Sequence, residues 1–341
     1  MVIVIIYTLV IHTPCFNNRE HYLIPKVNGL NACTSTFKEP MIMKSKDLVS
    51  LIILLSFTSC SVLHKNLTNL NKIKWIHGTE DCKNNIDPPI QIVQLNYNTW
   101  VLRQNKCINY EAPFLFLFLG NKKALLMDTG ATEDENKFPL YATVRKIIDN
   151  WEKKSGIKVS LVVAHTHAHS DHTAADGQFK NKENTTVAGL TVEEVTSFFK
   201  IENWPLKNST IDLGDRILEI IPIPGHQDAS VAVYDYETKI LLSGDSFYPG
   251  RLYIHDWLSF KLSIERLTEF TTNHTISYLL GNHIEMTNQP GKDYPTGTTF
   301  QPFEHILPLK VRDLKELNKA LIKIGDRPQY EVHNSFIIYP K

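Results

Sequence analysis

The segment SLVVAHTHAHSDH, residues 160–172, places four histidines and one aspartate within eight residues, directly after a short apolar run. The run Ser160–Ala164 predicts a buried strand. Histidine and aspartate side chains are costly to bury, because each needs a partner or a compensating charge. Imidazole and carboxylate groups are also the ligands that zinc and iron take in proteins. The segment therefore favours a metal site at a strand end over its alternative, a solvated histidine-rich loop.

Four other turns place a histidine or an aspartate after an apolar run. Their positions are Asp128 after 124–127, His226 after 217–223, Asp245 after 240–242 and His283 after 278–280. A glycine stands beside or near each of them, and glycine permits unusual backbone angles and close approach of the chain. Taken singly, such a turn is more often only a turn. Five of them in one chain indicate one shared site.

The complete pattern resembles the metallo-β-lactamase superfamily. It consists of His167-x-His169-x-Asp171-His172 followed, in this order, by His226, Asp245 and His283. Asp128, in Asp-Thr-Gly, matches the first motif of that family, so the resemblance covers about residues 90–290. It implies an α+β fold, a four-layer αββα sandwich, with the metal site at strand ends between the two sheets.

The resemblance also implies a role for each matching residue. One metal would be held by His167, His169 and His226, and a second by Asp171, His172 and His283, with Asp245 between the two. The expected cofactor is two Zn²⁺ per chain, with iron as the alternative. Asp171 would also orient the attacking hydroxide, which makes it the predicted catalytic residue. Asp128 would hydrogen-bond a ligand histidine and fix its tautomer.

Several residues near the motifs have weaker assignments. His165, His255, His274 and His305 are interpreted as structural or surface histidines. Tyr248, Arg251 and Tyr253 follow Asp245 and are either cleft residues or ordinary loop residues. The segment 286–305, rich in proline, glycine and threonine, is a candidate cleft wall.

The chemistry expected of such a site is hydrolysis. Two cations about 3.5–4 Å apart lower the pKa of a shared water and polarise a substrate oxygen. The predicted activity is hydrolysis of a small ester, lactone, thioester or amide, since an aspartate at position 245 resembles glyoxalase-II-like enzymes. Metallo-β-lactamases proper usually have Cys or Ser there. The alternatives are true β-lactamase activity, a mono-iron oxidoreductase resembling persulfide dioxygenases, and a non-catalytic surface lipoprotein.

Composition restricts the partners. Among 341 residues, Lys+Arg and Asp+Glu each total 36, so the formal net charge is zero. A protein that follows a nucleic-acid backbone usually has a basic excess, so no nucleic-acid partner is expected. The predicted partner is a small-molecule substrate.

The N-terminal part predicts export. The apolar run LVSLIILLSF, residues 48–57, follows Lys44 and Lys46 and precedes Thr-Ser-Cys60, as in a signal sequence. The cysteine resembles that of a bacterial lipoprotein signal, which implies a membrane anchor at Cys60 and a place in the cell envelope. The expected organisation is therefore an over-extended reading frame plus signal (1–60), a polar spacer (61–89) and the metallo-β-lactamase-like domain (90–341). In an oxidising envelope Cys82 and Cys107 would be free to pair.

The remaining pattern predicts alternating strands and helices. Hairpins are expected from 114–119 with 124–127 and from 230–234 with 240–242. Apolar residues at helical spacing predict helices around 144–151, 192–199, 264–270 and 314–324. Gly156 would end the first helix, and Thr191 with Glu194 would form a capping box before the second.

Overall fold

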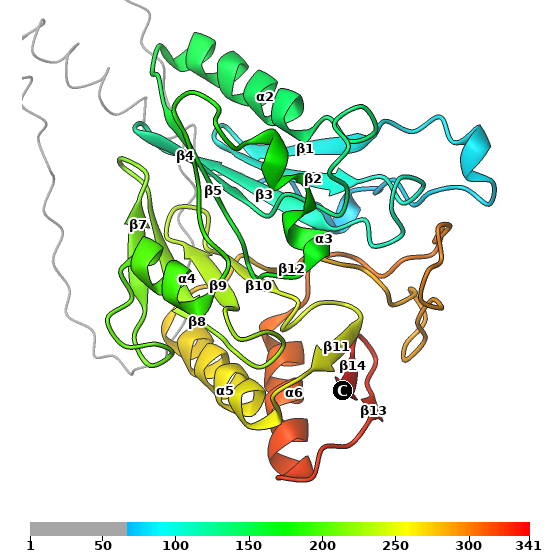
Figure 1. The fold of residues 1–341 in the computed structure, drawn as a ribbon. Coiled ribbons are helices and arrows are strands. Elements are labelled where there is room, and N and C mark those ends of the chain that lie inside the picture. Colours follow the sequence, from blue (N-terminus) through cyan, green and yellow to red (C-terminus); the bar gives the residue numbers. More distant parts are fainter. Residues whose placement is uncertain (1–66) are drawn as a thin grey trace, which may run out of the picture. The chain divides into compact units, whose positions relative to one another are not determined.

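The computed structural model describes residues 67–341. Two β-sheets lie face to face, and helices cover their outer surfaces (Figure 1). The six-stranded sheet has the order β1 (Ile90–Asn96), β2 (Thr99–Gln104), β3 (Phe114–Leu119), β4 (Lys123–Met127), β5 (Ser160–Ala164) and β6 (Thr185–Val187). The five-stranded sheet has the order β12 (Tyr278–Gly281), β10 (Ile240–Gly244), β9 (Val231–Asp235), β8 (Ile217–Pro222) and β7 (Ser209–Asp212).

The helices complete the four layers. They are α2 (Leu140–Ser155), α3 (Ser170–Thr173), α4 (Val192–Phe199), α5 (Trp257–Asn273) and α6 (Val311–Ile324), with 3-10 turns at Leu70–Lys72, Cys82–Asn84 and Ala174–Gln178. Helix α2 packs on the six-stranded sheet, whereas α5 and α6 pack on the five-stranded one. The described chain therefore has the αββα sandwich that the sequence predicted.

Strand β3 shows how the sequence builds the layers. Its sequence, FLFLFL, is fully buried along its length. Successive side chains of a strand point to opposite faces. Its phenylalanines, Phe114, Phe116 and Phe118, therefore enter the core between the two sheets, while the intervening leucines pack with α2. A strand buried on both faces belongs in the centre of a layered sandwich.

The predicted hairpins and helix ends are confirmed. Strand β3 pairs antiparallel with β4, and β9 pairs antiparallel with β10. Gly156 ends α2 with a φ of 74°, and Thr191 and Glu194 form the capping box of α4. Strands β4 and β5 are parallel, as are β10 and β12. Because the carboxyl ends of parallel strands meet at one edge of a sheet, the turns after these strands are brought together.

Several parts of the architecture were not predicted. Strands β1 and β2 extend the first sheet, and a three-stranded sheet forms from β11 (Arg251–Ile254), β14 (Ile337–Pro340) and β13 (Glu331–Val332). In addition, residues 67–89 do not form a spacer, because Leu70 and Trp75 are buried in the core between the sheets. The domain therefore begins before residue 90. The polar residues around these two side chains gave no sequence signal of this packing.

The predicted signal at 48–57 and the cysteine at 60 lie outside the described residues. Within residues 67–341, no helix combines the length and apolar character needed to cross a bilayer.

Cys82 and Cys107 form a disulfide, with Cα atoms 5.1 Å apart and a sequence separation of 25 residues. The pairing that the sequence left open is present. It ties the segment before β1 to the loop between β2 and β3, close to the end of the sheet that carries the ligands.

We expect the double variant Cys82→Ala/Cys107→Ala to lose about 3 kcal/mol of unfolding free energy, because closing a loop of this length restricts the unfolded chain. Guanidinium denaturation of the variant and of the oxidised parent would measure the difference. The parent reduced with dithiothreitol is the matched control and should resemble the variant. Equal midpoints for the oxidised parent and the variant would contradict the expectation.

Candidate metal centre

The seven predicted ligands come from four separate chain segments that meet at one edge of the sandwich. The turn after β5 carries His167 and His169, and α3 carries Asp171 and His172. His226 follows β8, Asp245 follows β10 and His283 follows β12. The structure gathers them into two groups, each with its ligand atoms within 4.8 Å of one another.

The first group is a trio of imidazoles. His169 Nδ1 lies 3.0 Å from His167 Nε2 and 3.1 Å from His226 Nε2. A neutral imidazole has one N–H, so three ring nitrogens cannot all satisfy one another by hydrogen bonds. Tetrahedral zinc with Zn–N bonds of about 2.0–2.1 Å places ligand nitrogens roughly 3.4 Å apart. The spacing of this trio therefore fits one shared cation.

The second group adds carboxylates to imidazoles. His172 Nε2 and His283 Nε2 are 3.2 Å apart. Asp171 Oδ2 lies 3.5 Å from the former nitrogen and 3.3 Å from the latter. Asp245 is the fourth member of this group. Mixed imidazole and carboxylate donors are suited to zinc and to iron.

Asp245 lies between the two groups. Its Oδ2 is 3.4 Å from His283 Nε2 and 3.5 Å from His172 Nε2. The same oxygen is 3.9 Å from His226 Nε2 and 4.0 Å from His167 Nε2. Its Oδ1 is buried without a hydrogen-bond partner. An unpaired buried carboxylate oxygen is costly, so this position fits a residue that binds cations on both sides.

Main-chain carbonyls orient two of the rings. His226 Nδ1 lies 2.7 Å from the Tyr253 carbonyl oxygen, and His283 Nδ1 lies 3.0 Å from that of Glu111. In each ring Nδ1–H donates to the carbonyl and Nε2 faces the group, where a bound metal would take the place of a proton. This arrangement fixes the tautomer that a metal needs.

Asp128 lies behind the ligands and is fully buried. Its Oδ1 accepts a hydrogen bond from the Thr166 backbone N–H at 2.8 Å, and its Oδ2 accepts one from Asn282 Nδ2 at 2.7 Å. His172 Nδ1 lies 3.5 Å from Asp128 Oδ2, and the two side chains form an ion pair when the histidine is protonated. Asp128 thereby connects the turn at Thr166 with the turn at Asn282, and each of these residues directly precedes a predicted ligand histidine.

The two groups differ electrostatically. Burial lowers the pKa of His226 to about 4 and holds the pKa of His167 well below its usual value. Burial acts in the same direction on His172 and His283, but the carboxylates of Asp245 and Asp171 outweigh it and raise their pKa well above the usual value. At neutral pH the first group is therefore neutral, and the second is an array of opposite charges.

The other histidines differ in their surroundings. His165 Nε2 lies 2.9 Å from Asp176 Oδ1, His274 stacks on Phe270, and His305 Nδ1 contacts its neighbour's carbonyl, which agrees with structural roles. His255 is exposed, in agreement with a surface histidine, but its ring centroid also lies 6.1 Å from that of His169 and 6.2 Å from that of His226. No sequence motif marks it, since it follows β11, which the sequence did not reveal.

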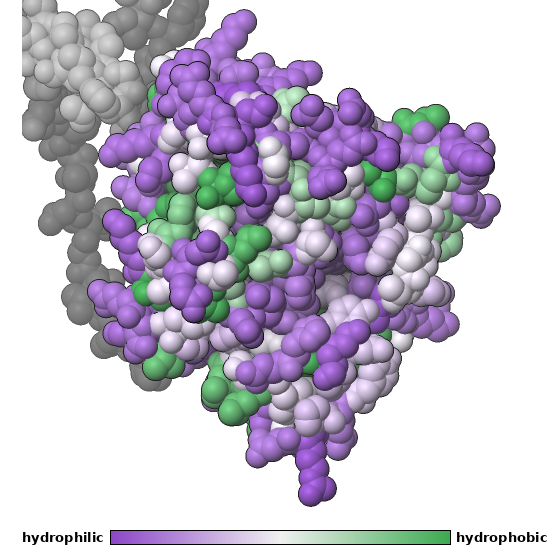
Figure 2. Space-filling model, in the orientation of Figure 1, coloured by the Kyte–Doolittle hydropathy of each residue, from purple (hydrophilic) through white to green (hydrophobic). Residues whose placement is uncertain are grey.

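A cavity of about 280 Å³ opens over the ligands. Besides ligand side chains, its lining consists of Glu111, Tyr248, Tyr253, His255, Glu285 and Lys341. The two tyrosines thus lie where one of the two sequence interpretations put them, while Arg251 lies behind the wall and donates to Glu285 Oε1 at 2.7 Å. Figure 2 shows that the face carrying α3 and β11 is mainly hydrophilic, with apolar side chains in separate small groups.

The segment 286–305 is not the cleft wall that the sequence suggested. Among the described residues that line the cavity, none belongs to this segment. Its Glu304 instead pairs with the buried Arg103, with Arg103 Nη1 donating to Glu304 Oε2 at 2.6 Å. The segment is therefore attached to β2 of the first sheet.

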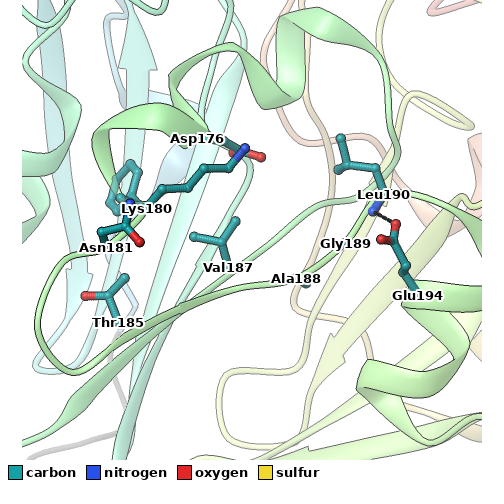
Figure 3. A pocket seen from close by; sticks show the side chains of 10 residues that line it. Asp176, Lys180, Asn181, Thr185, Val187, Ala188, Gly189, Leu190 and Glu194 are labelled. Atoms are coloured by element: carbon teal, nitrogen blue, oxygen red, sulfur yellow. Dashed lines mark hydrogen bonds between the residues drawn. The ribbon is translucent and has the colours of Figure 1, made fainter.

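A larger cavity, of about 530 Å³, lies elsewhere, beside β6 and α4. Asp176 and Glu194 are among its lining residues (Figure 3). Asp176 Oδ1 is bound to His165 and Thr129, and Glu194 Oε2 accepts backbone N–H groups from Leu190 and Thr191. The carboxylates of this cavity are thus engaged in structural bonds, and none of the seven predicted ligands lines it.

The chain is similar to several known proteins. A family model described as the metallo-beta-lactamase superfamily matches residues 112–274. An acyl-coenzyme A thioesterase of Homo sapiens is 26% identical over 204 residues, which cover 50% of this chain and 72% of the relative. A hydroxyacylglutathione hydrolase of Ectopseudomonas mendocina is 31% identical over 93 residues, 25% of this chain and 32% of the relative. A solved metallo-β-lactamase from Pontibacter korlensis has a TM-score of 0.42 and 19% identity, covering 57% of this chain and 91% of its own.

We expect Asp128→Asn to destabilise the fold by about 2 kcal/mol, because its amide nitrogen would face a donor where the carboxylate now accepts. Metal affinity should fall about 10- to 100-fold, since the turn carrying His172 loses its support. Denaturation and competitive metal titration would measure both. Asp149→Asn, on the exposed face of α2, is the matched control and should change neither.

Proposed function

Because residues 112–274 match the model of the metallo-beta-lactamase superfamily, we propose that the chain is a metal-dependent hydrolase of thioesters. The observation that carries this proposal is the position of Asp245 Oδ2, within 4.0 Å of ligand nitrogens from both groups. Such a position suits a two-metal site, and two-metal sites are used for hydrolysis. The names of two relatives, a thioesterase and a hydroxyacylglutathione hydrolase, support thioesters as the substrate.

The donor atoms support zinc as the metal, with two ions per chain. Three imidazoles in one group, and two imidazoles with two carboxylates in the other, are sets that zinc commonly takes. When bound, two such ions lower the pKa of a shared water and polarise a substrate carbonyl. Iron accepts the same donors and is distinguished by the metal analysis below.

The chain's own residues complete the mechanism. Asp171 lines the cavity, and although burial opposes it, His172 and His283 hold the pKa of its carboxyl well below the usual range. It is therefore an ionised acceptor that holds a proton of the attacking water and orients the remaining lone pair toward the substrate. Tyr248 also lines the cavity, but its hydroxyl donates to the Arg251 carbonyl oxygen, so its role is to shape the wall.

For Asp171→Ala we expect bound zinc to fall from about two ions per chain to one, since the second group loses a carboxylate. Thioester hydrolysis should fall at least 100-fold, because removing a residue that orients the nucleophile typically costs 10²–10⁴ in rate. Elemental analysis for zinc and iron and a panel of thioesters, lactones and a β-lactam would measure both. Asp326→Ala, whose side chain is 95% exposed, is the control.

The same measurements separate the alternatives. One iron per chain in the parent, with thiol-dependent oxygen consumption and no thioester hydrolysis, would replace the proposal with an iron oxidoreductase. Hydrolysis of the β-lactam alone would indicate a β-lactamase. A parent that binds no metal would contradict every metal-dependent function.

We also propose that the protein is exported and anchored by a lipid at Cys60. The signal-like residues 48–57 carry this proposal, and the Cys82–Cys107 disulfide supports it, since disulfides persist mainly in oxidising compartments.

We expect Cys60→Ser, expressed from the complete reading frame in a bacterial host, to move from the membrane fraction to the aqueous one and to stop incorporating labelled palmitate. Cys33→Ser, in the segment upstream of the signal, is the matched control and should behave as the parent. Palmitate labelling that persists in Cys60→Ser would overturn the anchor, and a parent retained in the cytoplasm would overturn export.

A further inference from the structure

The described chain enters the sandwich at the end opposite the predicted ligands. The Thr68 backbone N–H donates to the Leu95 carbonyl oxygen at 2.8 Å, and the Thr68 carbonyl accepts a hydrogen bond from the Tyr278 hydroxyl at 3.3 Å. Tyr278 is the first residue of β12, whereas His283 follows the last. Thr68 therefore lies at the far end of this strand from the metal centre.

This position restricts how an anchored domain can face a membrane. Cys60, the proposed site of the lipid, precedes Thr68 by only eight residues. An extended chain spans at most about 3.6 Å per residue, so this tether reaches no further than about 30 Å. The end of the sandwich that carries Thr68 would thus lie next to the lipid head groups, with the metal centre on the side away from them.

A groove of about 170 Å³ lies at this same end, between α2 and the hairpin of β1 and β2. Its walls include three aromatic residues, Tyr97, Trp100 and Trp151. The ring centroids of Tyr97 and Trp151 are 5.9 Å apart. The groove adjoins the entry of the chain, because Gln94 lines it and the Gln94 carbonyl accepts a hydrogen bond from the Thr68 hydroxyl at 2.9 Å.

The groove also offers donors for an anion. Lys154, in the last turn of α2, lines it, and within residues 67–341 no salt bridge involves the ammonium group of this lysine. Trp151 is 5% exposed, and its Nε1 is buried without a hydrogen-bond partner among the described residues. Buried donors are normally paired. A phosphate group suits both side chains, since it carries the opposite charge and accepts hydrogen bonds.

Nearby carboxylates do not cancel the charge of Lys154. None of the described residues that line the groove is acidic. On the same helix, Asp149 Oδ1 accepts a hydrogen bond from Arg145 Nη2 at 2.7 Å, and Glu152 Oε2 accepts one from Lys158 Nζ at 2.7 Å. These acidic side chains are therefore compensated by other cations, and Lys154 remains available to a ligand.

The aromatic walls favour a second kind of group. The face of a tryptophan or tyrosine ring attracts an ammonium group. These two residue types are also enriched where proteins meet the membrane–water interface, because their rings are amphipathic. A ligand that joins a phosphate to an ammonium group would therefore use both the walls and the donors of the groove.

We propose that this groove binds the head group of a zwitterionic phospholipid, of the ethanolamine type. The phosphate contacts Lys154 and the Trp151 N–H, and the ammonium group faces the rings of Tyr97 and Trp100. The inference rests on the proposed lipid anchor at Cys60 and is independent of the thioesterase function. Its consequence is orientation: the bound head group and the tether together turn the cavity over the ligands away from the bilayer.

The test measures binding of deacylated head groups to the complete chain in non-ionic detergent, by calorimetry and tryptophan fluorescence. The probes are glycerophosphoethanolamine and glycerophosphoglycerol, which lacks the ammonium group. For Lys154→Met we expect Kd to rise about two- to fivefold for both probes, because an exposed charge pair is lost. Lys153→Met, the neighbouring lysine outside the groove, is the matched control and should bind as the parent does. Tyr97→Leu should lose the preference for the ethanolamine probe.

Lipid nanodiscs identify the source of the head group. In discs that contain phosphatidylethanolamine, the parent should no longer bind the ethanolamine probe, because the lipid occupies the groove. In discs of phosphatidylglycerol alone, the probe should still bind. Equal probe binding in the two kinds of disc would overturn the lipid as the occupant.

The outcomes keep the proposals separate. Hydrolysis of a water-soluble thioester should be equal in Lys154→Met and the parent, since the groove lies at the opposite end of the sandwich. Probe binding that Lys154→Met weakens supports the groove even if Cys60 carries no lipid, a result that would remove only the anchor. Equal Kd values for the parent, Lys154→Met and Tyr97→Leu would overturn the groove.

Discussion

The constraint on which the structure depends is the convergence of five histidines and two carboxylates on one point between the sheets. All seven side chains come from turns, loops or a single helical turn rather than from strands, so their positions depend on the strands that precede them. Asp245 is the centre of the arrangement, because its Oδ2 faces ligand nitrogens of both groups and its Oδ1 has no partner. A site of this kind is a poor contributor to stability by itself, since buried and unpaired polar groups cost free energy. The apolar layers around it must therefore supply the stability.

The packing of those layers also explains unusual backbone angles in the turns near the predicted ligands. Gly225, before His226, has a φ of 134°, and a Cβ added there would overlap the backbone of Phe260 on α5. The glycine thus lets a ligand turn lie directly against a helix of the outer layer. Asp128 has a φ of 69°, an uncommon angle for an aspartate, and hydrogen bonds from Thr166 and Asn282 hold it there. Strain of this kind persists only where the surrounding structure imposes it.

Sequence reasoning succeeded where a signal is local. The histidines and aspartates of a short motif, the apolar run of β3 and the glycine that ends α2 can each be identified from neighbouring residues. It failed where the determinant is a partner distant in sequence. The segment Ile337–Pro340 has no feature that announces a strand beside Arg251–Ile254, and this pairing is what brings Lys341 and His255 to the cavity. Likewise, nothing in the polar segment before residue 90 reveals that Trp75 packs edge-on against Phe114, at a centroid distance of 4.8 Å.

The predicted ligands and part of the cavity wall come from different regions of the chain. Every predicted ligand except His283 lies within residues 112–274, the region that matches the family model. The cavity, by contrast, takes walls from outside that region, namely Glu111 before it and Glu285 and Lys341 after it. Glu111 connects the two, because its carbonyl orients the ring of His283 while its side chain lines the cavity. The disulfide at Cys107, in the same loop, restrains this residue. The cavity walls that lie outside the matched region are therefore connected to the predicted ligands through identifiable contacts.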